Sequence, residues 1–229
     1  LLSQVWGPCT VATLSANCKK IIEDYLLETV GSPLGADYRL HDFGFRGVSS
    51  IESAGLLGMA HLLSFKGTDT VKAVEFAMEY YGAKASCATS IPAAEHSTIT
   101  SWGKERETDA YRNMLNVYDS QPVIAVVSDS YDIYNAVNNI WGDSLKQMVI
   151  DRGTKGFITV IRPDSGDPVE TALGVANAIL NKFGFIENRK GYRLAPPYIR
   201  MIQGDGVNYE SIDRILMNFK ENKMAIDFI

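Results

Sequence analysis

Two patterns of apolar and polar positions take turns along the chain. Short apolar runs, many of them rich in β-branched residues, recur at intervals, and the stretches between them repeat apolar residues at helical spacing. Nearly every position in the runs is apolar, which is typical of strands buried on both faces in a parallel sheet covered by helices. The pattern predicts an α/β fold, either doubly wound or closed into a barrel. The strand candidates are residues 38–43, 60–65, 87–91, 123–127, 157–161, 198–202 and 225–229.

Helix signals between the runs support this alternation. The clearest is Asp167 followed by Pro168, a capping residue before a proline at the first helical position, and Gly184 is a suitable end for that helix. An amphipathic helix over residues 14–29 precedes the first strand candidate. Further apolar stripes predict helices that end before Gly82 or begin after Asp129 and after Asn208.

The order of these elements predicts the domain organisation. About seven consecutive βα units favour a barrel, so residues 33–229 are expected to form an incomplete α/β-barrel domain. Residues 1–32 are expected to be a helical segment of a flanking domain. The first residue is not Met, and the last residues form an apolar run, so we expect the chain to be a central piece of a longer protein.

Composition narrows the functional classes. The 229 residues are 46% hydrophobic and 21% charged with a net charge of -5, which argues against nucleic acid as the main partner because no cluster of Lys and Arg is present. No apolar run reaches the roughly 20 residues that span a bilayer, and the sequence predicts a cytoplasmic protein. The odd number and wide spacing of Cys9, Cys18 and Cys87 suggest neither a disulfide framework nor a zinc site.

Polar residues gather where the expected strands end. Six strand ends lead into Asp, His or Arg beside Gly or Ser, and in a parallel barrel those ends share the rim that carries the chemistry. Taken alone, Asp129 and Asp205 are typical helix caps. Arg46, His96 and Arg162 are poor capping residues, so the joint pattern indicates a site. The six segments are 41–47, 66–69, 95–98, 128–130, 162–166 and 203–206.

The residue types indicate a nucleotide-like ligand. Arg46 and Arg162 can clamp phosphate oxygens, and glycine-bearing turns at helix starts offer backbone N–H groups to the same kind of ligand. Asp164 and Asp205, each close to a glycine, suit ribose hydroxyls or a magnesium ion. Phosphates and a sugar together make a nucleotide.

Five sequence blocks strengthen this interpretation: residues 41–50, 92–98, 127–132, 161–166 and 202–206. In content and order they resemble the nicotinamide phosphoribosyltransferase family, and the resemblance covers essentially the whole chain. It implies a type II phosphoribosyltransferase with an α/β-barrel-like domain, a second domain from flanking sequence, and a homodimer with sites at the subunit interface. The implied reaction transfers phosphoribosyl from phosphoribosyl pyrophosphate to nicotinamide, giving nicotinamide mononucleotide and diphosphate for NAD salvage. Mg²⁺ would accompany phosphoribosyl pyrophosphate, and ATP would be a coupling substrate.

The resemblance also implies residue roles, with metal ligands left unassigned. Asp164 would stabilise positive charge that develops on the sugar, and His96 would be phosphorylated from ATP. Without the resemblance, Phe43 is typical of a core aromatic, Asp69 of a helix cap and His96 of a structural histidine. The substrate-binding set is Phe43 stacking on the pyridine ring, Asp69 accepting from the carboxamide, Arg46, His96 and Arg162 holding phosphate, and Asp164, Gly204 and Asp205 holding ribose.

Asp69 carries a physical argument about substrate choice. A carboxylate accepts a hydrogen bond from an amide, whereas nicotinate would place a second negative charge against it, at a cost of about 4 kcal/mol at ~4 Å and an effective dielectric of about 20. A nicotinate phosphoribosyltransferase on the same fold and a non-catalytic binding homologue remain alternatives. Two residues depart from the family pattern, Ala125 in place of a serine and Phe45 in place of a tyrosine. Because flanking walls of the site would be missing, we expect the isolated chain to be inactive.

Overall fold

The computed structural model describes residues 1–84 and 87–229, which divide into two compact units, Leu1–Ser90 and Ile91–Ile229. Each unit is described by itself. This division falls at a different place from the expected domain boundary after Ser32, and that boundary stays a prediction. In the described part of the chain, no helix combines the length and the apolar character needed to cross a lipid bilayer.

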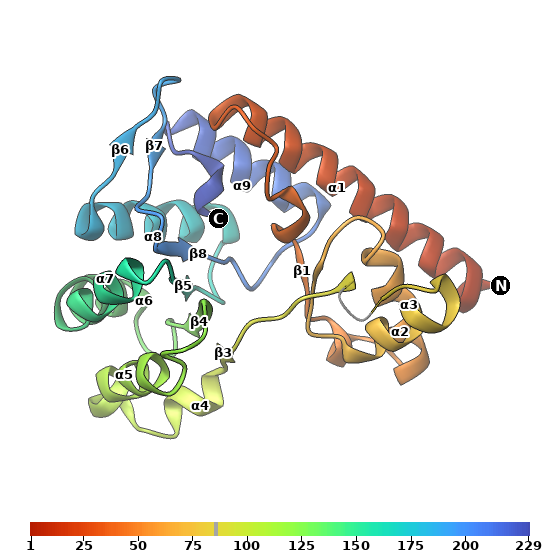
Figure 1. Cartoon of the computed structure of the whole chain (residues 1–229), viewed down its shortest axis with the longest axis horizontal. Coiled ribbons are helices and arrows are strands. Elements are labelled where there is room, and N and C mark those ends of the chain that lie inside the picture. The colour runs from red at the N-terminus through yellow and green to blue at the C-terminus, as the bar shows by residue number, and fades with distance from the viewer. Residues whose placement is uncertain (85–86) are drawn as a thin grey trace. The chain divides into compact units, whose positions relative to one another are not determined.

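Unit 1 is mainly helical around one parallel strand pair (Figure 1). His41 pairs with Gly67 and Asp42 with Thr68, so both strands end at the same edge. Ser50 caps α2 by accepting a hydrogen bond from the Ser53 amide at 3.0 Å. The elements are η1 Leu2–Trp6, α1 Gly7–Thr29, η2 Ala36–Tyr38, β1 His41–Asp42, η3 Phe45–Gly47, α2 Ile51–His61, β2 Gly67–Thr68 and α3 Val71–Tyr81.

Unit 2 is built on a four-stranded parallel sheet in the order β3-β4-β5-β8 (Figure 1). The carboxyl ends of all four strands therefore lie at one edge. A short antiparallel pair, β6 and β7, forms a separate sheet. The elements are β3 Ala93–Ala94, α4 His96–Thr100, η5 Lys104–Arg106, α5 Glu107–Val117, β4 Val123–Val127, α6 Ile133–Asn135, η6 Ala136–Ser144, α7 Lys146–Thr154, β5 Ile158–Arg162, α8 Pro168–Phe183, β6 Ile186–Glu187, β7 Arg193–Leu194, β8 Ile199–Met201, α9 Tyr209–Glu221 and η7 Ile226–Phe228.

The core of unit 2 lies between this sheet and its helices. Apolar residues of β4 and β5 are buried, and α8 buries one apolar side that includes Val175 and Ile179. The fully buried Trp141 stacks on Tyr111, with ring centroids 4.8 Å apart. Asp167 caps α8 by accepting from the amides of the second and third helical residues, as the sequence predicts. The sheet and its helices thus form a stable base for the loops at the strand ends.

The α/β class is confirmed, and so are several elements. Strand candidate 123–127 is β4, candidates 157–161 and 198–202 overlap β5 and β8, and the helix expected over 14–29 belongs to the longer α1. The first candidate, 38–43, shrinks to the two residues of β1.

Two strand predictions are wrong. Residues 60–65 form the end of α2 and the turn after it, and residues 225–229 contain the 3₁₀ turn η7 with Ile226 and Phe228 buried. A short apolar run predicts burial but does not distinguish a strand from a buried helix end. Candidate 87–91 contributes only a bridge from Thr89 to Gly67, and residues 85–86 before it lie outside the described residues. The described residues contain four parallel strands in one unit and two in the other, in place of about seven consecutive βα units.

Candidate functional site

Polar side chains from three neighbouring strand ends contact one another in unit 2. Glu95 and His96 follow β3, Asp129 follows β4, and Asp164 follows Arg162 at the end of β5. These strands are adjacent and parallel, so residues far apart in sequence meet at one edge of the sheet. We call Glu95, His96, Asp129, Arg162 and Asp164 the acid–base cluster.

Asp129 is the buried centre of the acid–base cluster, with a side chain only 4% exposed. Its carboxylate lies 3.0 Å from His96 Nε2 and accepts hydrogen bonds from the Asp164 amide at 2.8 Å and the Ser165 hydroxyl at 2.5 Å. Burial acts to raise the pKa of Asp129, but these hydrogen bonds outweigh it, and the pKa is lowered. The interpretation of Asp129 as a helix cap is wrong, because Asp132 caps α6.

His96 lies between two carboxylates. Its Nε2 contacts Asp129, and its Nδ1 is 3.7 Å from Asp164 Oδ2, beyond hydrogen-bonding distance. The ionised Asp129 favours the tautomer in which Nε2 carries the proton, so Nδ1 keeps a free lone pair. The imidazole is 43% exposed. Nδ1 is thus the ring nitrogen that stays available to another partner, on a partly exposed imidazole.

Arg162 is a buried arginine that forms an ion pair with Glu95. Its Nη1 and Nη2 donate to the two carboxylate oxygens of Glu95 at 3.2 and 3.1 Å, in a bidentate pair. The Arg162 side chain is 9% exposed, whereas that of Glu95 is 62% exposed. Although Glu95 precedes His96 in the sequence, Glu95 contacts the arginine, and Asp129 contacts the imidazole.

Asp164 has the opposite electrostatic setting to Asp129. Burial raises the pKa of Asp164, and the neighbouring charges of Asp129 and Glu95 raise it further, while Arg162 and His96 oppose the shift. The side chain is 19% exposed, and Arg162 Nη2 lies 3.7 Å from Asp164 Oδ2. Asp164 is a carboxylate that would gain from a positively charged ligand.

Gly204 and Asp205 follow β8 at the next strand end. A Cβ atom at Gly204 would overlap Asp164 Oδ1 and come within 3.4 Å of the Arg162 side chain, so this position needs glycine for space. The Gly204 amide donates to the Pro163 carbonyl at 3.0 Å, which ties the two loops together. Asp205 is exposed, and its carbonyl accepts from Gln203 Nε2 at 2.9 Å. Asn208 caps α9, so the cap interpretation of Asp205 is also wrong.

Unit 1 holds the other predicted site residues. Phe43 follows β1 and is 41% exposed, and its ring lies 6.1 Å from that of His41. Asp69 follows β2 and is held by the Ser90 hydroxyl and by His41 Nε2, the latter at 3.1 Å. His41 therefore pairs with Asp69 and lies near the Phe43 ring. The Asp69 carboxylate is 45% exposed, which leaves it accessible to another donor.

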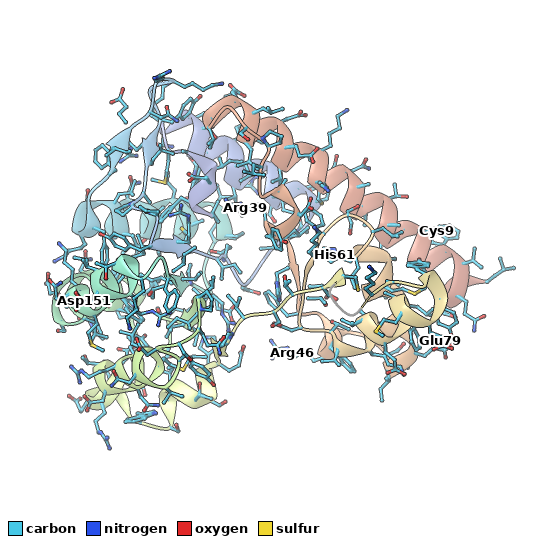
Figure 2. The ribbon with its side chains drawn as sticks, in the orientation of Figure 1. Cys9, Arg39, Arg46, His61, Glu79 and Asp151 are labelled. Atoms are coloured by element: carbon cyan, nitrogen blue, oxygen red, sulfur yellow. The ribbon has the colours of Figure 1, made fainter. Side chains whose placement is uncertain are left out.

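Arg46, labelled in Figure 2, is exposed on the turn η3 Phe45–Gly47 of unit 1. Arg162, Asp164, His96 and Gly204 are brought together in unit 2, and Asp205 lies beside Gly204 in the same loop. In the part of the chain that the structure describes, no group of three or more His, Cys, Asp or Glu side chains is arranged to hold a metal ion.

Comparison with known proteins places this geometry in a family. Residues 38–228 match the nicotinate phosphoribosyltransferase (NAPRTase) family. The chain belongs to this family. The match spans both the Phe43–Asp69 region of unit 1 and the acid–base cluster of unit 2, and the parallel α/β architecture agrees with a type II phosphoribosyltransferase.

Several curated proteins that are similar in sequence to this NAPRTase-family chain are named nicotinamide phosphoribosyltransferases. A nicotinamide phosphoribosyltransferase of Xanthomonas campestris pv. campestris (strain 8004) is 50% identical over 99% of the chain and 48% of its own length. Proteins of the same name from Mycoplasma pneumoniae (strain ATCC 29342 / M129 / Subtype 1) and Acinetobacter baylyi (strain ATCC 33305 / BD413 / ADP1) are 32% and 29% identical, over 96% and 98% of the chain and 48% of each relative. The chain spans about half the length of these relatives.

Sequence reasoning missed the central position of Asp129 and the partner of Glu95. One signal for Asp129 was present: two acidic residues, Asp129 and Asp132, precede the same helix, and only one of them can be its cap. The link from His41 to Asp69 carried no such signal, because it depends on the register of β1 against β2.

Proposed function

We propose that the full-length protein containing this chain transfers phosphoribosyl from phosphoribosyl pyrophosphate to nicotinamide, giving nicotinamide mononucleotide and diphosphate in NAD biosynthesis. The observation that carries the proposal is the meeting of Arg162, His96 and Asp164 beside Gly204 at one edge of a parallel sheet. The names of the relatives support the choice of nicotinamide.

The reaction breaks the bond from the anomeric carbon to the diphosphate oxygen and forms a bond to the pyridine nitrogen. That nitrogen carries a lone pair and no proton, so the step needs no general base. The product is a pyridinium cation, and the sugar gains positive charge as diphosphate leaves. Asp164 would stabilise this charge, while Arg162 would stabilise the departing diphosphate. Gly204 and Asp205 would hold the ribose, with Gly204 leaving the space that Asp164 needs.

Magnesium enters this proposal with the substrate. The described side chains do not form a metal site of their own, so no step is assigned to an ion held by the protein. A Mg²⁺ ion bound to phosphoribosyl pyrophosphate would reduce the repulsion between diphosphate and the three carboxylates of the acid–base cluster.

His96 is proposed as the phosphate acceptor that couples ATP to synthesis. Nδ1 would attack the γ-phosphorus of ATP, forming an N–P bond while the bond to ADP breaks. Nε2–H would remain bonded to Asp129, which is buried and has a lowered pKa. Asp129 is thus a positioning residue that fixes the ring and its tautomer.

In unit 1, Phe43 would stack on the pyridine ring and Asp69 would accept a hydrogen bond from the carboxamide. Ser90 and His41 fix the Asp69 carboxylate without covering it. Arg46 is exposed and would bind phosphate. As the resemblance implies, we also propose a cytoplasmic homodimer for the full-length protein.

Nicotinate is the second candidate substrate, because the family that the chain matches is named for nicotinate. The two are separated by measuring turnover of nicotinamide and nicotinate side by side with the full-length protein. We expect the wild type to prefer the amide, and Asp69→Asn to reduce the amide-to-acid ratio of kcat/KM by about tenfold or more, because the negative charge that repels nicotinate is gone.

Asp24→Asn is the matched control for this experiment, since Asp24 is an exposed carboxylate on α1 in the same unit. It should leave the ratio unchanged. Equal turnover of both substrates by the wild type, or an Asp69→Asn ratio equal to that of the wild type, would refute the assignment of Asp69.

A further inference from the structure

Glu95 occupies both terminal nitrogens of Arg162, the arginine proposed to bind diphosphate. The bidentate pair, at 3.2 and 3.1 Å, uses Nη1 and Nη2 of Arg162 together. A diphosphate presents two oxygens with spacing and charge similar to those of a carboxylate, so it would use the same pair of donors. Glu95 and diphosphate would therefore exclude each other on Arg162.

Glu95 is the exposed member of its pair with Arg162, and it is also the N-cap residue of α4, where its side chain takes part in a capping box with Thr98. Its side chain is 62% exposed, whereas Arg162 is 9% exposed and stays in place. The backbone of Glu95 is fixed independently, because its amide donates to Thr98 Oγ1 at 3.1 Å and its carbonyl accepts from the same hydroxyl at 2.7 Å. Release from Arg162 would thus be a rotation of the Glu95 side chain about a fixed backbone.

The carboxylates around Arg162 determine how much the exchange of Glu95 for diphosphate costs. Arg162 faces the carboxylates of Glu95 and Asp164, and Asp129 adds a third negative charge close by. The charge of the arginine is therefore already neutralised by side chains of its own chain. Diphosphate must replace Glu95 on Arg162, and breaking that ion pair reduces the net free energy of diphosphate binding.

We propose that Glu95 is a competing internal anion, which closes the Arg162 site until diphosphate or a diphosphate-bearing substrate displaces it. The inference rests on the proposed function, because it takes Arg162 to be the diphosphate-binding residue. Glu95 would set the affinity for diphosphate and would disfavour weaker anions that cannot displace it.

The test is the binding of inorganic diphosphate to the full-length protein in excess magnesium, measured by isothermal titration calorimetry. Glu95→Gln removes the charge and keeps the shape, so the dissociation constant should fall by about fivefold relative to wild type, the scale expected for a partly exposed ion pair. Glu105→Gln makes the same charge change on the exposed turn η5 of the same unit and should leave the constant unchanged. Glu95→Ala removes both hydrogen bonds that Glu95 accepts from Arg162. It should strengthen diphosphate binding at least as much as Glu95→Gln does.

A purely structural role for Glu95 predicts the opposite sign, since loss of a brace for Arg162 would weaken diphosphate binding. Unchanged or weaker binding by both Glu95 variants would overturn the inference while leaving the Arg162 site in place. Absence of diphosphate binding by the wild type and all variants would refute the Arg162 site itself, and with it this part of the proposed function.

Discussion

Two aspartates of the acid–base cluster differ in what their surroundings do to their charge. Asp129 is surrounded by donors, and its pKa is lowered although burial opposes this. Asp164 has its pKa raised by burial first and by neighbouring carboxylates second. The fold thus stabilises the charge on Asp129 and disfavours the charge on Asp164. This division suits a positioning role for Asp129 and a role in stabilising a cationic transition state for Asp164.

The division predicts opposite effects of two matched substitutions on stability. Asp129→Asn should reduce the free energy of unfolding at pH 7 by about 1–3 kcal/mol, because charge-assisted hydrogen bonds to a buried group are lost. The folded-state pKa of Asp129 lies below its unfolded value, so the ionised side chain stabilises the fold above the unfolded pKa, and this is lost as the pH falls through the folded pKa. The deficit of Asp129→Asn should therefore shrink in acid.

Asp164→Asn should leave the free energy of unfolding at pH 7 unchanged or raise it, because a raised folded pKa means that the ionised form is disfavoured in the fold. Urea denaturation of both variants between pH 7 and pH 3 measures the two effects. A loss of stability at pH 7 in Asp164→Asn equal to that in Asp129→Asn would contradict this account of the acid–base cluster.

At the scale of elements, the sequence predicts long strands and capped helices well. β4 and β5 have five residues each and are largely buried, so their apolar runs are clear. β1, β2 and β3 have two residues each, which is too short for any period to be visible. Residues 60–65 are apolar because the end of α2 is buried, and no local signal separates this from a strand. The strand-end loops were nevertheless located, because polar residues after apolar runs mark them regardless of strand length.

The cap of α8 fixes the loop that follows Arg162 and Asp164. Asp167 accepts hydrogen bonds at 2.9 Å from the amides of both Val169 and Glu170. Asp167→Ala should lower the free energy of unfolding by about 1 kcal/mol, whereas Asp167→Asn, which also caps well, should cost much less. Thermal or urea denaturation distinguishes the two, and equal stability of the Ala variant and the wild type would show that the cap contributes nothing.

At the scale of the molecule, the contacts of the candidate site are long-range and appear only once the sheet is formed. Glu95 and Arg162 are 67 positions apart, and Asp129 reaches the amide of Asp164 across 35 positions. Residue types and strand ends were enough to predict that Arg162, His96 and Asp164 lie close together. Which carboxylate holds which partner depends on strand order and register, which no local pattern contains. The family match covers both compact units, while the chain spans about half of each relative, so its activity is tested in the full-length protein.

The measurement that tests the account most directly is the rate of nicotinamide mononucleotide formation by the full-length protein from nicotinamide and phosphoribosyl pyrophosphate, with and without ATP. Asp164→Asn should reduce this rate by about a hundredfold or more, and His96→Ala should abolish the enhancement by ATP. Asp151→Asn, a control on α7 labelled in Figure 2, should stay within about twofold of the wild type. An Asp164→Asn protein that forms product at the wild-type rate, or a His96→Ala protein that keeps the full enhancement, would contradict the proposed roles of these residues.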